Sequence, residues 1–415
     1  KVSLDIEPQD SKEFTVPVGN LKPQAGTEYF VNFNVTTVEK EPLIPIGHEI
    51  ACDQFRLPIE SPKKAFKISG PKLTVSTNGD NLSASSSKVN FMFNKKTGIV
   101  TSYKVDGTEY FSEGFGIQPN FWRAPTDNDY GNGMPKRLQV WKESSKNFNV
   151  TDATVTMDGN NAVVNVNYLL PAGNLYIVNY TIYPSGAVNV AARFTSTDMD
   201  AAQTEVSEST RTATFTPGRD AARKEASKLN VPRIGVRFRL PASMNQVEYF
   251  GRGPAENYLD RNAGSMVGLY KSTAEELYFP YVRPQENGHH TDTRWVSLST
   301  GKKGLLIQAD NTIGFNALRN SIEDFDDEEA TGLSRQWSNF TPEQVANHDE
   351  AAAKNVLRRQ HHINDITPRD FVEVCVDLKQ QGVAGYDSWG SRPEPAYTLP
   401  ANQEYNWGFT LIPLK

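Results

Sequence analysis

Hydrophobic and polar residues alternate in short runs along most of this 415-residue chain, a pattern typical of β-strands that bury one face. Turns that contain proline or glycine separate the first runs, which lie at residues 13–16, 29–36 and 48–57. Glycine-containing turns join the later runs, at residues 94–98, 106–107, 158–159 and 184–186. Pairs such as Asp106-Gly107 supply the positive φ that a tight reversal between antiparallel strands requires. The pattern therefore predicts an all-β chain with a large antiparallel sandwich rather than parallel βαβ units.

A stretch with prolines and several charges, residues 61–71, is the expected linker between two domains. Residues 1–60 before it are expected to form a small sandwich, and residues 72–415 after it a much larger one. The chain opens at Lys1 directly in a strand pattern and without an initiator methionine. We interpret this start as a cut inside a larger protein, which leaves bacterial cytoplasm and periplasm both open as locations.

Helices are expected at few places. Residues 135–145 have an amphipathic pattern, and residues 341–355 open with Thr341 as a cap and Pro342 at the first helical position. The segment at residues 196–230 is polar and rich in alanine and threonine, which predicts an insertion on the surface.

Composition narrows the classes of partner. Charged residues make up 22% of the chain and its net charge is −6, so no basic field is available to hold a nucleic acid. No apolar run approaches the roughly 20 residues that cross a bilayer, which predicts no membrane partner. The two cysteines, Cys52 and Cys375, show no metal-binding spacing, and we expect two free buried thiols.

Trp389 is the first candidate for a functional residue. It lies in a loop dense in glycine, serine and aspartate, residues 385–390, after a strand expected at residues 371–378. Asp387 and Ser388 stand beside it. Sugars have one apolar face, against which an exposed indole stacks, so the loop is a candidate carbohydrate contact. Composition alone fits a packed structural tryptophan as well.

A second candidate is the aromatic and acidic segment at residues 121–131. Arg123 pairs with Asp127 or Asp129 in one interpretation, which makes the segment a structural polar network. The two aspartates are calcium-like ligands in the other, although the spacing of an EF-hand loop is absent. The Gly-Asn-Gly sequence at residues 131–133 is a natural hinge, so we expect this loop to move.

The Gly251-Arg-Gly-Pro254 sequence does not fit a dinucleotide fingerprint, because no further glycine opens a helix and Pro254 lacks an amide donor. We expect a tight turn in which Glu256 and Asn257 bond the backbone.

A third candidate combines Glu286 with His289 and His290. A carboxylate and an imidazole can act as an acid–base pair in a cleft. Two adjacent histidines on a strand point to opposite faces, which disfavours a shared metal ion. A structural set of bonds between histidine and carboxylate is the third interpretation.

Together these segments resemble a known family. Four sequences occur in the order typical of the C-terminal portion of family 2 glycoside hydrolases of the β-galactosidase type: FWRAPTDNDYG at 121–131, GRGPAEN at 251–257, YVRPQENG at 281–288 and DSW at 387–389. The resemblance covers nearly the whole chain. It implies a partial immunoglobulin-like β-sandwich at residues 1–60. It also implies a large antiparallel supersandwich of the galactose mutarotase-like type at residues 72–415.

The same resemblance implies the chemistry. Family members cleave β-galactosides with retention, using two glutamates on a (β/α)₈ barrel, and this chain has no alternating strand–helix pattern to form one. The resemblance therefore implies no catalytic residue and no cofactor in this chain, since the family's metal ligands belong largely to the barrel. The expected partners are a β-galactoside or galactose, and the barrel and N-terminal domains of the same protein.

Site roles follow from the resemblance in the same way. Trp389, with Asp387 and Ser388, is expected to contact substrate at the mouth of the barrel. The residues Asp127, Asn128, Asp129 and Gly131 are expected to form a loop at the active-site entrance. Glu286, His289 and His290 are candidate cleft residues. Two other functions remain open: a non-catalytic carbohydrate-binding module, and a mutarotase-like epimerase that uses these three cleft residues.

Overall fold

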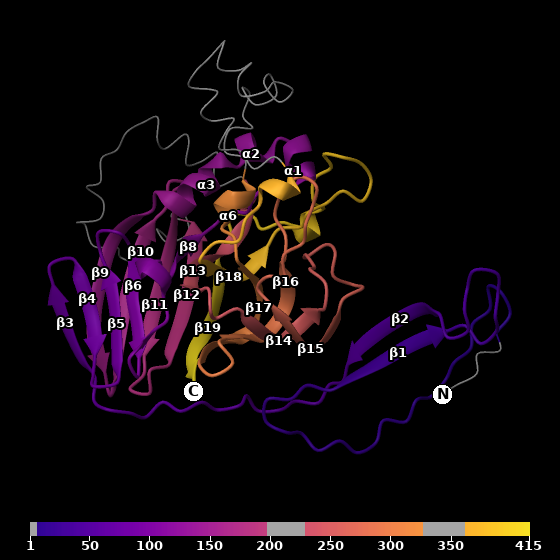
Figure 1. Cartoon of the computed structure of the whole chain (residues 1–415), viewed down its shortest axis with the longest axis horizontal. Coiled ribbons are helices and arrows are strands. Elements are labelled where there is room, and N and C mark those ends of the chain that lie inside the picture. The colour runs from indigo at the N-terminus through magenta and orange to yellow at the C-terminus, as the bar shows by residue number, and fades with distance from the viewer. Residues whose placement is uncertain (1–5, 197–228, 327–361) are drawn as a thin grey trace, which may run out of the picture. The chain divides into compact units, whose positions relative to one another are not determined.

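The computed structural model describes residues 6–196, 229–326 and 362–415 (Figure 1). The chain divides into two compact units, Lys1–Phe66 and Lys67–Lys415, and the division falls within the stretch expected as a linker. The helix expected at 341–355 lies outside the described residues, as does nearly all of the insertion expected at 196–230.

The described part of the first unit contains one antiparallel pair, β1 (Phe30–Thr36) and β2 (Glu49–Arg56). Both match runs expected as strands, but residues 13–16, also expected as a strand, form none. Apolar side chains of the pair remain at the surface, with Phe55 54% and Ile50 61% exposed. Cys52 is also exposed, so the expectation of a buried thiol there was wrong.

The second unit contains two antiparallel sheets. The smaller one follows sequence order: β3 (Thr74–Asn78), β4 (Asn81–Ser85), β5 (Val89–Asn94), β6 (Ile99–Val105) and β7 (Thr108–Glu109). The larger one has twelve strands among the described residues. Its main path runs β15-β14-β16-β17-β19-β12-β11-β10-β9, and β18 extends it from β17 through β13 to β8.

The strands of the larger sheet have these bounds: β8 (Gln118–Asn120), β9 (Asn149–Asp158), β10 (Asn161–Leu169), β11 (Asn174–Ile182), β12 (Val188–Ser196), β13 (Arg233–Pro241), β14 (Gln246–Gly253), β15 (Met266–Thr273), β16 (His290–Ser299), β17 (Gly304–Leu318), β18 (Phe371–Gln380) and β19 (Tyr405–Leu414). The all-β prediction for this part of the chain is confirmed. The expected reversals are also confirmed: Asp106 and Gly107 both adopt positive φ between β6 and β7, and Gly159 does so between β9 and β10.

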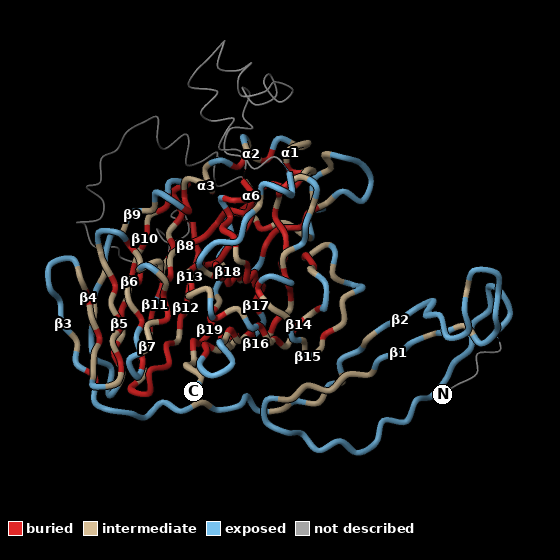
Figure 2. The backbone as a smooth tube through the Cα atoms, viewed as in Figure 1, coloured by how far each residue is buried: buried red, intermediate tan, exposed pale blue. Residues whose placement is uncertain are grey.

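Buried positions run through the second unit, and Figure 2 shows them most densely around β13 and β18 of the larger sheet. One continuous apolar cluster contains side chains from both sheets. Phe91 on β5 and Tyr180 on β11 meet with their ring centroids 5.6 Å apart. Tyr103 on β6 donates from its hydroxyl to the carbonyl of Gly186, 2.6 Å away, in the turn before β12. Aromatic rings therefore fill the space between the layers while their polar tips bond turn backbone.

Short helices cover one end of the unit: α1 (Asp127–Gly131), α2 (Met134–Arg137), α3 (Gln139–Lys146) and α6 (Ile322–Phe325). The helix expected at 135–145 is confirmed but is divided at Leu138. Figure 1 shows α1 and the loop after β18, in yellow, at the same end of the sheets. The candidate functional residues gather at this end.

Candidate functional site

Trp389 projects from the loop after β18 with 66% of its surface exposed. Asp387 and Ser388 beside it are exposed as well. The base of the loop is closed by the amide of Gly385, which donates to the hydroxyl of Ser391 at 3.0 Å. An indole this exposed is not a packing anchor within the described part of the chain, and its apolar face is available to a ligand.

Helix α1 lies directly against the base of this loop. Asn128 joins the two: its Oδ1 accepts from the amide of Gly390 at 3.1 Å, and its Nδ2 donates to the carbonyl of Val383 at 3.3 Å. A methyl group on Gly131 would come within 2.7 Å of Gly390 Cα and 3.1 Å of Trp389 Cε2. The backbone of α1 and the Trp389 loop therefore approach too closely for any side chain at position 131.

Arg123 and Asp129 fix α1 in place. Thr126 caps the helix in a capping box with Asp129, whose carboxylate also receives two hydrogen bonds of 3.0 Å from the buried Arg123 guanidinium. Arg123 further donates to the carbonyls of Gln381 (2.7 Å) and Gly382 (3.0 Å), at the start of the Trp389 loop. The pairing of Arg123 with an aspartate is confirmed. The calcium interpretation of Asp129 was wrong, because the guanidinium holds both of its oxygens.

A cavity of about 170 Å³ opens beside α1. Its walls include Asp127 and Asn128 of α1, Tyr258 and Arg261 after β14, and Gln285 and Glu286 before β16. Asp127 is held in place by Gln285, whose Oε1 accepts from the Asp127 amide at 3.0 Å. Of the three candidate cleft residues, Glu286 therefore reaches a cleft.

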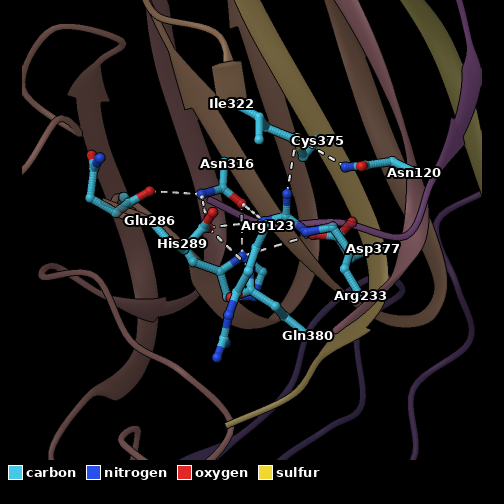
Figure 3. A network of polar contacts seen from close by, with 12 residues as sticks. Asn120, Arg123, Arg233, Glu286, His289, Asn316, Ile322, Cys375, Asp377 and Gln380 are labelled. Carbon is cyan, nitrogen blue, oxygen red and sulfur yellow. Dashed lines mark hydrogen bonds and ion pairs between the residues drawn. The ribbon is translucent and has the colours of Figure 1, made fainter. Parts of the chain in front are cut away.

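Behind the cavity lies a buried polar network (Figure 3). The Arg233 guanidinium on β13 donates to Glu286 at 3.0 Å and to Asn316 at 2.9 Å. Its Nε lies 3.2 Å from Asp377 Oδ2 on β18, an ion pair that lacks the angle of a hydrogen bond. Burial raises the pKa of Asp377 to about 7 despite the opposing charge of Arg233, and Glu286 adds to the rise. The Arg233 guanidinium thus links its own strand β13 to β17, to β18 and to the loop before β16.

His289 and His290 lie in this interior, each 1% exposed, and neither lines the cavity beside α1. His289 Nδ1 lies 2.9 Å from Asn316 Oδ1, while both ring nitrogens of His290 lie 3.2 Å from backbone carbonyl oxygens. Burial lowers the pKa of His289 to about 3, helped by the Arg233 charge, and burial lowers that of His290 to about 4. The interpretation of these two histidines as cleft residues was wrong, because both rings are buried and bond interior groups, His289 the Asn316 side chain and His290 the backbone.

These two histidines make the fold sensitive to acid. The unfolded chain takes up these protons near pH 6.5 and the folded chain only near pH 3 to 4, so the histidine contribution to the free energy of unfolding falls as the pH falls below 6.5. Asp377, whose buried carboxyl has its pKa raised to about 7, contributes in the opposite direction over the same pH range. We expect each histidine to cost about 2 kcal/mol between pH 7 and pH 5. Urea unfolding at the two pH values measures the loss. The variant His290→Gln is expected to reduce this loss, and the difference between the wild-type chain and the variant isolates the histidine contribution from groups that titrate in the opposite direction.

The turn at residues 251–257 forms as expected. Asn257 donates to the carbonyls of Arg252 (3.1 Å) and Ala255 (3.0 Å), and Glu256 accepts from the amide of Gly288 at 2.7 Å. Within the ranges that the structure describes, no group of three or more histidine, cysteine, aspartate or glutamate side chains is placed to hold a metal ion. No helix in those ranges has the length and apolarity needed to cross a membrane.

Comparison with known proteins identifies the family. Residues 85–411 match the family described as Beta galactosidase small chain, and residues 1–58 match the one described as Beta-galactosidase, domain 4. The chain belongs to the beta-galactosidase small chain family. A beta-galactosidase of Priestia megaterium is 30% identical to it over 415 residues, which are 99% of this chain but 34% of that protein. A beta-galactosidase of Streptococcus thermophilus is 25% identical over 418 residues, again 34% of its length.

The chain thus spans about a third of the length of these relatives and corresponds to part of a larger beta-galactosidase. A beta-galactosidase small subunit of Latilactobacillus sakei is 27% identical over 332 residues, 77% of this chain and 92% of that one. Among solved structures, a galactose 1-epimerase from Lactobacillus acidophilus aligns with 83% of the chain at 8% identity and a TM-score of 0.40.

Sequence patterns singled out the Trp389 loop and the segment at residues 121–131, but they predicted a loop where helix α1 forms and did not indicate what surrounds either segment. Tyr258 and Arg261 follow the Gly-Arg-Gly-Pro turn and line the cavity, yet nothing in their spacing indicates a shared wall with α1. Arg233 lies at the start of a strand, where an arginine is ordinarily exposed, and its 0% exposure has no sequence signal.

Proposed function

We propose that the chain is the sugar-contacting part of a retaining β-galactosidase, in which Trp389 stacks on the galactosyl ring of the substrate. The observation that carries the proposal is the exposure of Trp389 on a loop fastened to α1 through Asn128. A rigid, exposed indole loses little conformational entropy when a sugar stacks on it.

Neighbouring polar groups complete the contact. Asp387 and Ser388 are exposed next to the indole and are suited to accept and donate hydrogen bonds at the rim of a sugar. The α1 residues Asp127, Asn128, Asp129 and Gly131 then lie at the entrance of the active site, with Gly131 keeping the loop and helix in close contact. The expected substrate class is a β-galactoside, with galactose as the product.

Hydrolysis itself is assigned to a partner barrel, on the same polypeptide or on a separate subunit. Retention needs two carboxyl groups about 5–5.5 Å apart, one as nucleophile and one as acid and base. Glu286 is committed elsewhere, because its Oε1 accepts from Arg233, Asn316 and Gln380 at 3.0 Å each. The proposal therefore assigns no catalytic residue and no cofactor to the described part of this chain.

The purified 415-residue chain is accordingly expected to show no hydrolysis of a chromogenic β-galactoside above buffer, while the same assay on a protein that also carries the barrel shows turnover. The reason is that the proposed substrate contacts of this chain do not include the two carboxyl groups that carry out hydrolysis, which are assigned to the barrel. Release of the chromophore by pure chain, abolished in the variant Glu286→Gln, would contradict the proposal.

A carbohydrate-binding module without a part in catalysis also uses an exposed indole. The two functions differ in the effect of Trp389 on turnover. If the chain is only a binding module, it binds sugar with or without the barrel, and a substitution of Trp389 leaves the turnover of the enzyme unchanged. The epimerase alternative lacks its imidazole acid and base in the cavity, because His289 and His290 lie in the interior.

A further inference from the structure

The cavity beside α1 is not used by the proposed stacking on Trp389. We infer that it is a second carbohydrate site, which binds one neutral monosaccharide ring. The inference goes beyond the proposed function and does not rest on it, because the cavity is lined by none of Trp389, Asp387 and Ser388. Asp127 and Asn128, which belong to the proposed entrance, form the wall that the two sites have in common.

The first argument is the hydrogen-bonding capacity of the walls. Tyr258 lines the cavity, and its hydroxyl is buried without a hydrogen-bond partner among the described residues. Glu286 also lines it, and all the hydrogen bonds that the described residues donate to its carboxylate go to Oε1. A buried polar group without a partner is costly, so native structures ordinarily pair it with protein, water or a ligand. A phenol and a carboxylate oxygen suit the hydroxyls of a sugar, which both donate and accept.

The second argument is the charge of the walls. Each charged side chain lining the cavity already has an opposite charge close by: Arg261 lies 2.8 Å from Glu256, Asp127 lies 3.6 Å from Arg283, and Glu286 lies 3.0 Å from Arg233. A cation would meet the guanidinium of Arg261, and an anion would meet the carboxylates of Asp127 and Glu286. Pairing of this kind favours a ligand without net charge, since either kind of ion would leave one wall group repelled.

The third argument is size. The volume of about 170 Å³ slightly exceeds the ~150 Å³ that holds a benzene-sized molecule. It lies below the ~300 Å³ at which sites for drug-sized ligands begin. One six-membered ring with its hydroxyls fits this range, and a disaccharide does not. The side chain of Arg261 is 52% exposed, so the cavity reaches the surface and a sugar can enter.

The cavity is separate from Trp389 but joined to it through one residue. Asn128 lines the cavity and bonds the backbone on either side of the Trp389 loop, at Val383 and Gly390. The Tyr258 ring itself is covered on its faces, by His289 at a centroid distance of 5.5 Å and by the Arg261 guanidinium at 5.1 Å. Recognition in the cavity therefore depends on the edges of polar groups rather than on stacking, which distinguishes the two sites.

The test uses the complete 415-residue chain with D-galactose and D-glucose as probes, followed by titration calorimetry and by saturation-transfer NMR. Saturable binding of one sugar per chain is expected. The variant Tyr258→Phe removes a hydroxyl that bonds nothing in the described protein, so its melting temperature is expected to be unchanged or higher. Its affinity is expected to fall about 2- to 10-fold, the fold-change of one hydrogen bond between neutral groups.

Two matched variants separate the outcomes. Tyr168→Phe removes a hydroxyl that donates to the carbonyl of Gly98 at 2.9 Å, far along the sheet, and is expected to lower the melting temperature with no change in affinity. Trp389→Ala is expected to leave binding in the cavity intact. The inference is overturned if the wild-type chain binds neither sugar saturably, or if Trp389→Ala removes binding while Tyr258→Phe retains it. The second result would place the sugar on the Trp389 loop and leave the proposed function standing.

Discussion

Replacing Arg233 with methionine is expected to lower the free energy of unfolding of the second unit by about 3–5 kcal/mol. Arg233 is fully buried and lies within 3.2 Å of two buried carboxylates, those of Glu286 and Asp377. Methionine fills a similar volume but leaves both carboxylates without their cation in a medium of low dielectric constant. Urea unfolding followed by tryptophan fluorescence measures the change.

The size of this loss depends on pH. The pKa of Asp377 is already raised to about 7 by burial, and losing the guanidinium raises it further. At pH 5 Asp377 is therefore protonated in both the wild type and the variant, whereas at pH 8 the wild type has the ionised form paired with Arg233, so the loss is expected to be smaller at pH 5 than at pH 8. The matched control is Arg193→Met, whose ion pair with Glu404 at 3.6 Å is partly exposed and is expected to contribute at most about 1 kcal/mol. Equal losses in the two variants would show that the buried network does not hold the unit together.

The variant Trp389→Ala, made in a galactosidase that contains this chain, is expected to lower kcat/KM about 10- to 100-fold. Aromatic stacking contributes about 0.5–1.5 kcal/mol beyond the burial of apolar area, which itself adds a similar amount for a partly covered ring. Because 66% of the side chain is exposed in the chain alone, its removal leaves little cavity, and the melting temperature is expected to change little. Steady-state kinetics measures kcat/KM, and thermal unfolding of the same preparation measures the melting temperature.

Trp141→Ala is the control for that experiment. Trp141 on α3 is completely buried against Phe121 and Phe194, with ring centroids 6.3 and 5.9 Å away. Its truncation is expected to cost about 3–5 kcal/mol and to lower the melting temperature clearly. If Trp389→Ala lowers the melting temperature to the same extent, Trp389 is a core residue and the stacking proposal fails.

Much of the fold was accessible from the sequence because its determinants are local. The alternation of β10 and β11 and the Asp-Gly and Pro-Ser-Gly reversals act over two to ten residues, and the structure forms strands and turns at those places. The exposed loop of Trp389 was predictable for the same reason, since its glycines and aspartate disfavour burial. The division of the helix at Leu138 was not predicted, because the apolar pattern continues through it.

The buried network could not be predicted from the sequence, since its members meet only through sheet register. Arg233 on β13 and Asp377 on β18 are 144 residues apart in the sequence, but their strands are neighbours in the sheet. Glu286 reaches them from a loop, and His289 follows it into the interior. A histidine pair near a glutamate has the same sequence appearance whether it faces a cleft or a core. Only the register of β16 against β17 decides which of the two occurs.

The position of β19 has a consequence for biosynthesis. This strand, the latest in sequence order of the twelve, lies between β12 and β17 and bonds both of them along its length. Until residues 405–414 have left the ribosome, two long strand edges in the middle of the sheet stay open to wrong partners. In a nascent chain, the edges of β12 and β17 are therefore the places in this sheet where pairing with another chain would start.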